Sequence, residues 1–232
     1  LEPSITLSPL TVDAAIASGI DQKSAIIAEL KSALKSSQNI LFEGNNYSDE
    51  WAAEAEKRGL SNIKNTPEAL KAYISKQAEE TFVNNGIFTN EELHARYEVM
   101  LEDYAKKIQI EGRVLGELVY SHILPPAIDY LTSLANNVKS LKDAGLKAGA
   151  AQSELIEAVS QHIDAAKQKT DQMIEARKKA NAMDSTEEMA VSYHYDIKES
   201  FEDIRYHTDK LEQLVDDKNW QLPKYRELLF IR

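Results

Sequence analysis

Apolar residues recur at helical spacing along three long segments of this chain, and this pattern restricts the fold more than any other feature. Alternating steps of four and three place one side chain per turn on the same face of a helix, and about four heptads of such steps are typical of a helical bundle. The first apolar series comprises Tyr97, Leu101, Tyr104, Ile108, Glu111, Leu115, Leu118 and His122. The second comprises Ile156, Val159, Ile163, Ala166, Thr170, Met173, Arg177 and Ala180. The third comprises Tyr193, Ile197, Ile204, Thr208, Leu211 and Val215.

Short connections separate the three series. Residues 143–153 are rich in Ala and Gly, and Ser185 followed by Glu188 is a helix-capping signal. A capping-box pattern at Thr89 marks the start of the first long helix. Because short connections make consecutive helices antiparallel neighbours, we predict an all-α fold in which residues 89–232 form a long antiparallel bundle of three main helices.

Two consecutive prolines, Pro125 and Pro126, directly follow the first series. A proline inside a helix lacks an N–H donor and clashes with the preceding turn, and it disfavours the α region for the residue before it. Beyond the prolines the apolar stripe lies one residue earlier than the first series requires, and comprises Ile128, Leu131, Ala135 and Val138. We therefore predict a sharp kink or break at Leu124–Pro126. The arm before it would pack on short helices, and the arm after it in the bundle.

The N-terminal third predicts a separate subdomain of short helices over residues 1–88, with a turn-rich loop at 42–47. Residues 21–37 read as one such helix, with an apolar face formed by Ile26, Ile27, Leu30 and Leu34. Thr66 before Pro67 reads as an N-cap. At the other end, Leu228, Leu229, Phe230 and Ile231 make an apolar C-terminal tail that we expect to be docked on the protein's own body or on a neighbouring chain.

Composition excludes several classes of function. The chain has 27 Lys+Arg against 38 Asp+Glu, a formal charge of −11, which argues against nucleic acid or an anionic membrane as a partner. It has no cysteine, so a cytoplasmic location is the simplest expectation. No apolar run approaches the roughly 20 residues that a membrane span needs. Since the first residue is Leu1, we expect the chain to be part of something larger.

Few residues have a pattern that suggests chemistry. Glu91 and His94 have the Glu-x-x-His spacing of di-iron bundles, but no second copy accompanies them, so a solvated helix start is the better interpretation. His122, before the prolines, is interpreted as a packed, hydrogen-bonded histidine. Arg177 occupies a core-facing position and needs a carboxylate, for which Glu111 is a candidate. We predict no catalytic, cofactor-binding or metal-binding residue, and structural roles for Pro125, Pro126, His122 and Arg177.

Three stretches of the chain resemble the type III glutamine synthetases, the long-subunit class. They are FEGNNYSDEWAAEAEKRGLSNIKNTPEAL, NEELHARYEVMLEDYAKKIQIEGRVLGELVYSHILPPAIDYL and IRYHTDKLEQLVDDKNWQLPKYRELLFIR. They occur in the family's order within residues 41–232. The resemblance places this segment C-terminal to a β-rich catalytic region of the same subunit.

The resemblance implies a parent enzyme of nitrogen metabolism that ligates ammonia to L-glutamate with ATP and Mg or Mn, assembled as a double ring of identical subunits. It also implies that this segment lacks the catalytic motifs, is inactive alone, and has a structural, assembly or regulatory role beside the upstream catalytic region. The alternative function is a free-standing helical adaptor that binds a partner protein through its apolar series. A third interpretation is a carboxylate-bridged metal enzyme.

Overall fold

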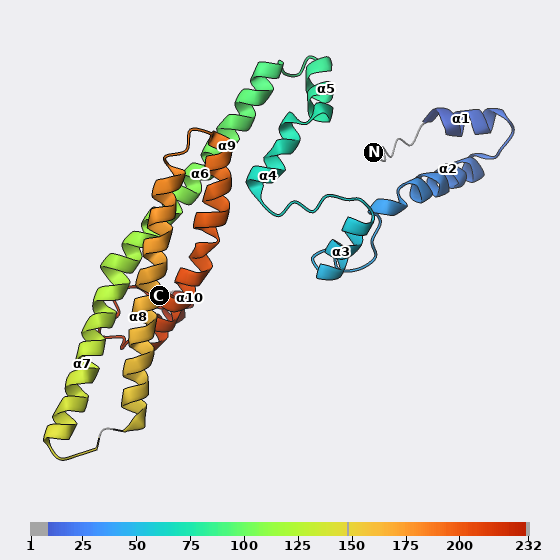
Figure 1. Ribbon diagram of the computed structural model, residues 1–232. Coiled ribbons are helices and arrows are strands. Elements are labelled where there is room, and N and C mark those ends of the chain that lie inside the picture. The colour runs from blue at the N-terminus through green and yellow to red at the C-terminus, as the bar shows by residue number, and fades with distance from the viewer. Residues whose placement is uncertain (1–8, 148, 231–232) are drawn as a thin grey trace. The chain divides into compact units, whose positions relative to one another are not determined.

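The computed structural model describes residues 9–147 and 149–230, and every regular element in these ranges is helical (Figure 1). The prediction of an all-α fold is therefore confirmed. The described residues form two compact units that divide between Lys64 and Asn65. The first unit contains α1 (Pro9–Ala17), α2 (Gln22–Ser36), η1 (Gln38–Ile40) and α3 (Asp49–Lys57). The second contains α4 (Thr66–Leu70), η2 (Lys71–Ile74), α5 (Lys76–Asn84), α6 (Asn90–Leu118), η3 (Val119–Ile123), α7 (Leu124–Asp143), α8 (Ala150–Ala180), α9 (Thr186–Ser192), η4 (Tyr193–Lys198), α10 (Ser200–Leu214) and α11 (Tyr225–Leu228).

In the first unit, local capping defines the short helices. Gly19, with φ of 95°, ends α1, and the Asp21 carboxylate accepts a hydrogen bond from the Ser24 N–H to start α2. Arg58, at the end of α3, donates to the Leu41 carbonyl at 2.5 Å and so holds the loop after η1. The apolar face predicted on residues 21–37 is largely uncovered, with Leu34 57% exposed.

The second unit is an antiparallel bundle, as predicted. α6, η3 and α7 form one long continuous helix, α8 runs back along it, and α9, η4 and α10 lie beside α8 (Figure 1). The buried core confirms the second and third apolar series, because most members of the second and every member of the third are buried. The buried members are Val159, Ile163, Ala166, Thr170, Met173, Ala180, Tyr193, Ile197, Ile204, Thr208, Leu211 and Val215.

The prediction at Leu124–Pro126 was a sharp kink or a break, and the helix continues through the prolines without a break. Leu124 has φ −64° and ψ −46°, within the α region, and its N–H donates to the Val119 carbonyl, five residues earlier. η3 is a π-helical turn placed directly before Pro125 and Pro126. Its wider ladder accommodates both rings, and the chain stays helical from Asn90 to Asp143.

The first apolar series follows the core only as far as Ile108, and beyond it the buried stripe lies one residue later. Gly112, Gly116, Val119 and Ile123 are buried, whereas Glu111 is exposed and Leu115, Leu118 and His122 are half-buried. The stripe continues past the prolines through Ala127, and the half-buried positions beyond it are Tyr130, Leu131, Leu134, Val138 and Leu141. Ile128 and Ala135, predicted to face inward, are exposed. One stripe therefore runs through the prolines without the predicted rotation.

The two glycines permit close packing at the centre of the bundle. A Cβ added to Gly112 would lie 3.4 Å from Ile197 Cγ2, and one added to Gly116 would lie 3.6 Å from Met173 Cε. The neighbouring helices thus pack directly on the α6 backbone. Glycine at position 112 costs about 1 kcal/mol of helix propensity relative to alanine, although a Cβ there would make only ordinary van der Waals contacts.

The short helices α4, η2 and α5 pack on α6 and belong to the bundle unit. The Asn65 side chain, and not that of Thr66, caps α4 by accepting from the Glu68 N–H at 2.8 Å. Asn65 also donates to the Tyr195 hydroxyl at 2.8 Å. The compact unit consequently begins at Asn65, whereas the sequence placed the boundary after residue 88.

A polar contact centred on Glu187 joins η2, α6 and α9. The Tyr97 hydroxyl on α6 donates to Glu187 on α9 at 3.0 Å, and Lys71 on η2 pairs with the same carboxylate at 2.8 Å. Burial, together with Glu187, raises the pKa of Tyr97 to about 12. Tyr97 therefore remains protonated and able to donate at any physiological pH.

Candidate functional site

The predicted structural residues lie in two places on the bundle. Pro125 is exposed and Pro126 is buried, and both lie in the first turn of α7, after the π-helical turn that accommodates their rings. His122 is half-buried within η3. Arg177 lies near the end of α8, away from this turn. The four residues therefore form no common site.

Arg177 faces the contact between α8 and η4 without the predicted carboxylate partner. Among the described residues its Nε is buried without a hydrogen-bond partner, and no ion pair joins it to Glu111, which is exposed. Nearby, the Tyr193 hydroxyl donates to the Asn181 side chain at 2.6 Å, and Gln109 donates to the same oxygen at 2.9 Å. Burial raises the pKa of Tyr193, and the Arg177 charge partly opposes this rise. Tyr193 is thus close enough to Arg177 to feel its charge, and its phenol stays neutral.

Replacing Arg177 with methionine is therefore expected to raise the free energy of unfolding by about 1 kcal/mol, because a buried, unpaired donor is removed and the apolar stem is kept. Chemical denaturation followed by circular dichroism measures this. Lys178→Met, at an exposed position on the same helix, serves as the control and should change stability by less than about 0.5 kcal/mol. A clear loss of stability in Arg177→Met would mean that the guanidinium has a partner that matters.

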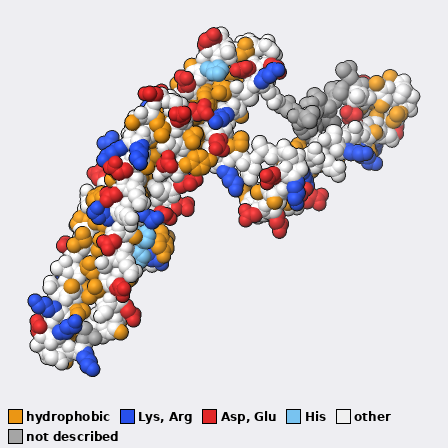
Figure 2. All heavy atoms as spheres, viewed as in Figure 1, with side chains coloured by type: hydrophobic (Ala, Val, Ile, Leu, Met, Phe, Trp, Pro, Cys, Tyr) orange, Lys and Arg blue, Asp and Glu red, His pale blue; other side chains and the backbone are white. Residues whose placement is uncertain are grey.

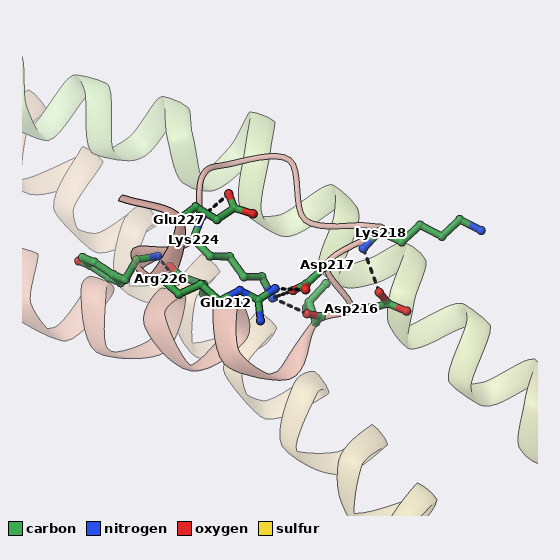
Figure 3. Close-up of polar contacts among 9 residues, drawn as sticks. Glu212, Asp216, Asp217, Lys218, Lys224, Arg226 and Glu227 are labelled. Atoms are coloured by element: carbon green, nitrogen blue, oxygen red, sulfur yellow. Dashed lines mark hydrogen bonds and ion pairs between the residues drawn. The ribbon is translucent and has the colours of Figure 1, made fainter. Parts of the chain in front are cut away.

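A second polar cluster holds the chain that follows α10, and we call it the tail clasp (Lys224, Tyr225 and Arg226 with their partners on residues 212–217; Figure 3). Lys224 is 8% exposed, and its ammonium donates to the Val215 carbonyl at 2.9 Å and pairs with Asp217 at 2.7 Å. Val215 is the C-cap of α10, so this contact satisfies a carbonyl at the helix end.

Further contacts of the tail clasp fix the short helix α11. The Tyr225 N–H donates to the Glu212 carboxylate at 2.9 Å, and Arg226 pairs with Asp217 (Figure 3). Just before them, Trp220 is 9% exposed and packs into the hydrophobic core. The chain from Trp220 to Lys224 is thus anchored to the bundle.

The apolar side chains that follow the tail clasp are exposed to solvent. Leu228, Leu229 and Phe230 are 68%, 79% and 76% exposed, so among the described residues these apolar side chains are not docked; Ile231 lies outside the described residues. The sequence predicted an apolar C-terminal tail, but not the burial of Trp220 and Lys224 that anchors the chain before it. The signal was available, because a tryptophan and a lysine so close after an amphipathic helix can both be buried only if the chain folds back.

A groove of about 590 Å³ lies where α8 faces α9, η4 and α10. Its floor includes Met173, and one end is bridged by the ion pair of Lys169 and Asp203 at 2.6 Å. On the opposite wall, Ser192 donates to Asp196 at 2.6 Å. Acidic and basic side chains are interspersed over the visible face of the bundle, with no extended patch of a single sign there (Figure 2).

Metal-binding side chains do not converge within residues 9–147 and 149–230, where no group of three or more His, Cys, Asp or Glu could hold a metal ion. His94, of the Glu-x-x-His pattern, lies 3.4 Å from the Glu79 carboxylate on the surface. We assign no residue of this chain to ATP or a divalent metal. None of the described helices is both long and apolar enough to cross a membrane.

Comparison with known proteins relates the chain to one family. A family model described as "Glutamine synthetase C-terminal domain" matches residues 25–142. A glutamine synthetase of Bacteroides fragilis (strain YCH46) is 41% identical over 227 residues, covering 96% of this chain and 31% of that protein. A glutamine synthetase of Butyrivibrio fibrisolvens is 33% identical, covering 92% and 31% respectively. The type-3 glutamine synthetase of Dictyostelium discoideum is 30% identical, covering 88% and 28%. The chain thus spans about a third of the length of these curated relatives.

Proposed function

This chain belongs to the glutamine synthetase C-terminal domain family, and we propose that it serves as a helical assembly module of a type III glutamine synthetase, in which catalysis takes place in another region of the same subunit. The parent reaction would be the ATP-dependent ligation of ammonia to L-glutamate in the cytoplasm. In this proposal the module makes contacts between subunits and to the catalytic region.

The observation that carries the proposal is a set of large apolar side chains that are exposed although the bundle has its own buried core. Leu228, Leu229 and Phe230 project from a segment that the tail clasp holds in place. Large apolar side chains that are fixed and exposed together are typical of surfaces that bind another protein. The face of α2 that carries Leu30 and Leu34 is a second surface of this kind, in the other unit.

The adaptor alternative requires the second and third apolar series as binding faces. Those series are buried in the chain's own core, with Val159, Ile197 and Leu211 each 0% exposed. A partner helix could reach them only by unfolding the bundle. The uncovered surfaces therefore favour an assembly module over an adaptor that binds through its apolar series.

The test replaces Leu228, Leu229 and Phe230 together with serine in the complete glutamine synthetase polypeptide. We expect the mass of the assembly, measured by light scattering, to fall toward that of smaller oligomers while the circular dichroism spectrum is retained. Val99→Ser is the matched control, because Val99 is 64% exposed on α6 and far from the tail in sequence. An unchanged assembly mass in the triple variant would contradict a role of the tail in assembly.

A further inference from the structure

Two histidines meet across the contact between α8 and α10. The Nδ1 atoms of His162, on α8, and His207, on α10, are 3.0 Å apart. Their ring centroids are 5.2 Å apart and the ring planes tilt by 52°, so the contact is a hydrogen bond and not a stack. Both side chains are half-buried, and the two helices pack side by side at this level (Figure 1).

The number of protons on the pair decides whether this contact can exist. Two neutral imidazoles provide one N–H donor and one lone-pair acceptor, and the bond survives the addition of one proton. When both rings of His162 and His207 are protonated, each Nδ1 carries a hydrogen and no acceptor remains. Two like charges then face each other at hydrogen-bond distance.

The neighbouring groups favour the neutral pair. The Tyr206 ring lies edge-on to both imidazoles, with centroids 6.2 Å from His162 and 5.1 Å from His207. Burial lowers the pKa of His162 below its usual 6.5, and His207 and Lys210 lower it further. Burial also lowers the pKa of His207, assisted by Lys169.

One acidic neighbour acts against this shift. The Asp203 charge raises the pKa of His207, but its effect is smaller than that of burial or of Lys169. Asp203 is itself paired with Lys169 at 2.6 Å, which moderates its influence. The net direction for both histidines is downward, so both are neutral near pH 7.

We propose that His162 and His207 form an acid-sensitive clamp that fixes α10 to α8 at neutral pH and releases it in acid. Since the folded chain binds protons at this site less readily than the unfolded chain, the stabilisation is complete above about pH 6.5 and is lost as the pH falls through the lowered pKa values. α10 also carries Glu212 of the tail clasp, and Val215 of the clasp is its C-cap, so the release extends to the tail.

Hydrogen exchange measured by mass spectrometry on the full-length protein tests the clamp. After correction for intrinsic rates, peptides of α8 around His162 and of α10 around His207 should exchange faster at pH 5.5 than at pH 7.5. The expected increase at pH 5.5 is at most about tenfold for each histidine, because the usual pKa of 6.5 lies only one unit above that pH. Peptides of residues 49–57, which contain no histidine, provide the internal reference.

The variant His162→Gln/His207→Gln removes the titration and keeps amide groups that can donate and accept, so its exchange should no longer depend on pH. His94→Gln, at an exposed histidine on α6, should retain the acid response. If the double variant does not fold, NMR titration of the wild-type imidazoles replaces it and should show both pKa values below 6.5. The clamp is refuted by equal wild-type exchange at both pH values, by an acid response that persists in the double variant, or by unshifted imidazoles.

Discussion

Gly116→Leu is expected to lower the free energy of unfolding by about 1–3 kcal/mol. A Cβ at position 116 would already lie in ordinary contact with the side chains of Met173, Ile174 and Thr170, at 3.6–3.8 Å. The additional atoms of leucine would have to push α8 away from α6. Chemical denaturation of the variant, followed by circular dichroism, measures the loss.

Gly116→Ala is the matched control, and it should be neutral or stabilise the helix by up to about 1 kcal/mol. Its single added methyl group fits the available space, and alanine has the higher helix propensity. If leucine and alanine had the same effect, close approach of α8 to the α6 backbone at this position would be contradicted.

Lys224→Met is expected to cost about 1–3 kcal/mol, because the buried Val215 carbonyl loses its charged donor and the more exposed Asp217 loses one of its two cationic partners. Methionine retains the apolar stem beside Trp220, so the loss reports the ammonium group. We expect faster amide exchange over residues 216–228, measured by mass spectrometry, while the exchange of α8 stays unchanged.

Arg226→Met removes the neighbouring partner of Asp217 and provides the control. Because both members of that pair are more than half exposed, its loss should cost less than about 1 kcal/mol. Equal effects of the two substitutions would show that burial of Lys224 does not set the strength of the tail clasp.

Sequence periodicity predicted the bundle because the second and third apolar series are regular. In each of these helices the buried residues lie on one continuous face. The same reasoning failed after Ile108, where two glycines form the contact face. A search for large apolar residues passes over Gly112 and Gly116, although side chains of the neighbouring helices pack against α6 at both positions. Because the first series was continued in the wrong register after Ile108, the sequence predicted a rotation of the apolar stripe at the prolines that the structure does not have.

The candidate sites were less predictable, since they depend on pairs that are distant in sequence. Nothing in the spacing of His162 and His207 along the chain indicates that they meet. Each directly precedes a buried core position, Ile163 or Thr208, and aligning the second and third series at those positions would have suggested the contact. For Arg177 the sequence could not identify a partner, because spacing along one helix does not specify the register against its neighbour.

The π-helical turn before Pro125 also has a consequence for chain length in related sequences. A π turn is equivalent to a single-residue insertion accommodated within an α-helix. Deleting one residue from η3 would restore ordinary α spacing, bring the Pro125 ring against the carbonyl four residues earlier, and rotate everything beyond it by about 100°. We expect related sequences to keep the two prolines together with the extra residue of the π-helical turn. A deletion in η3 should be tolerated only where the prolines are also replaced.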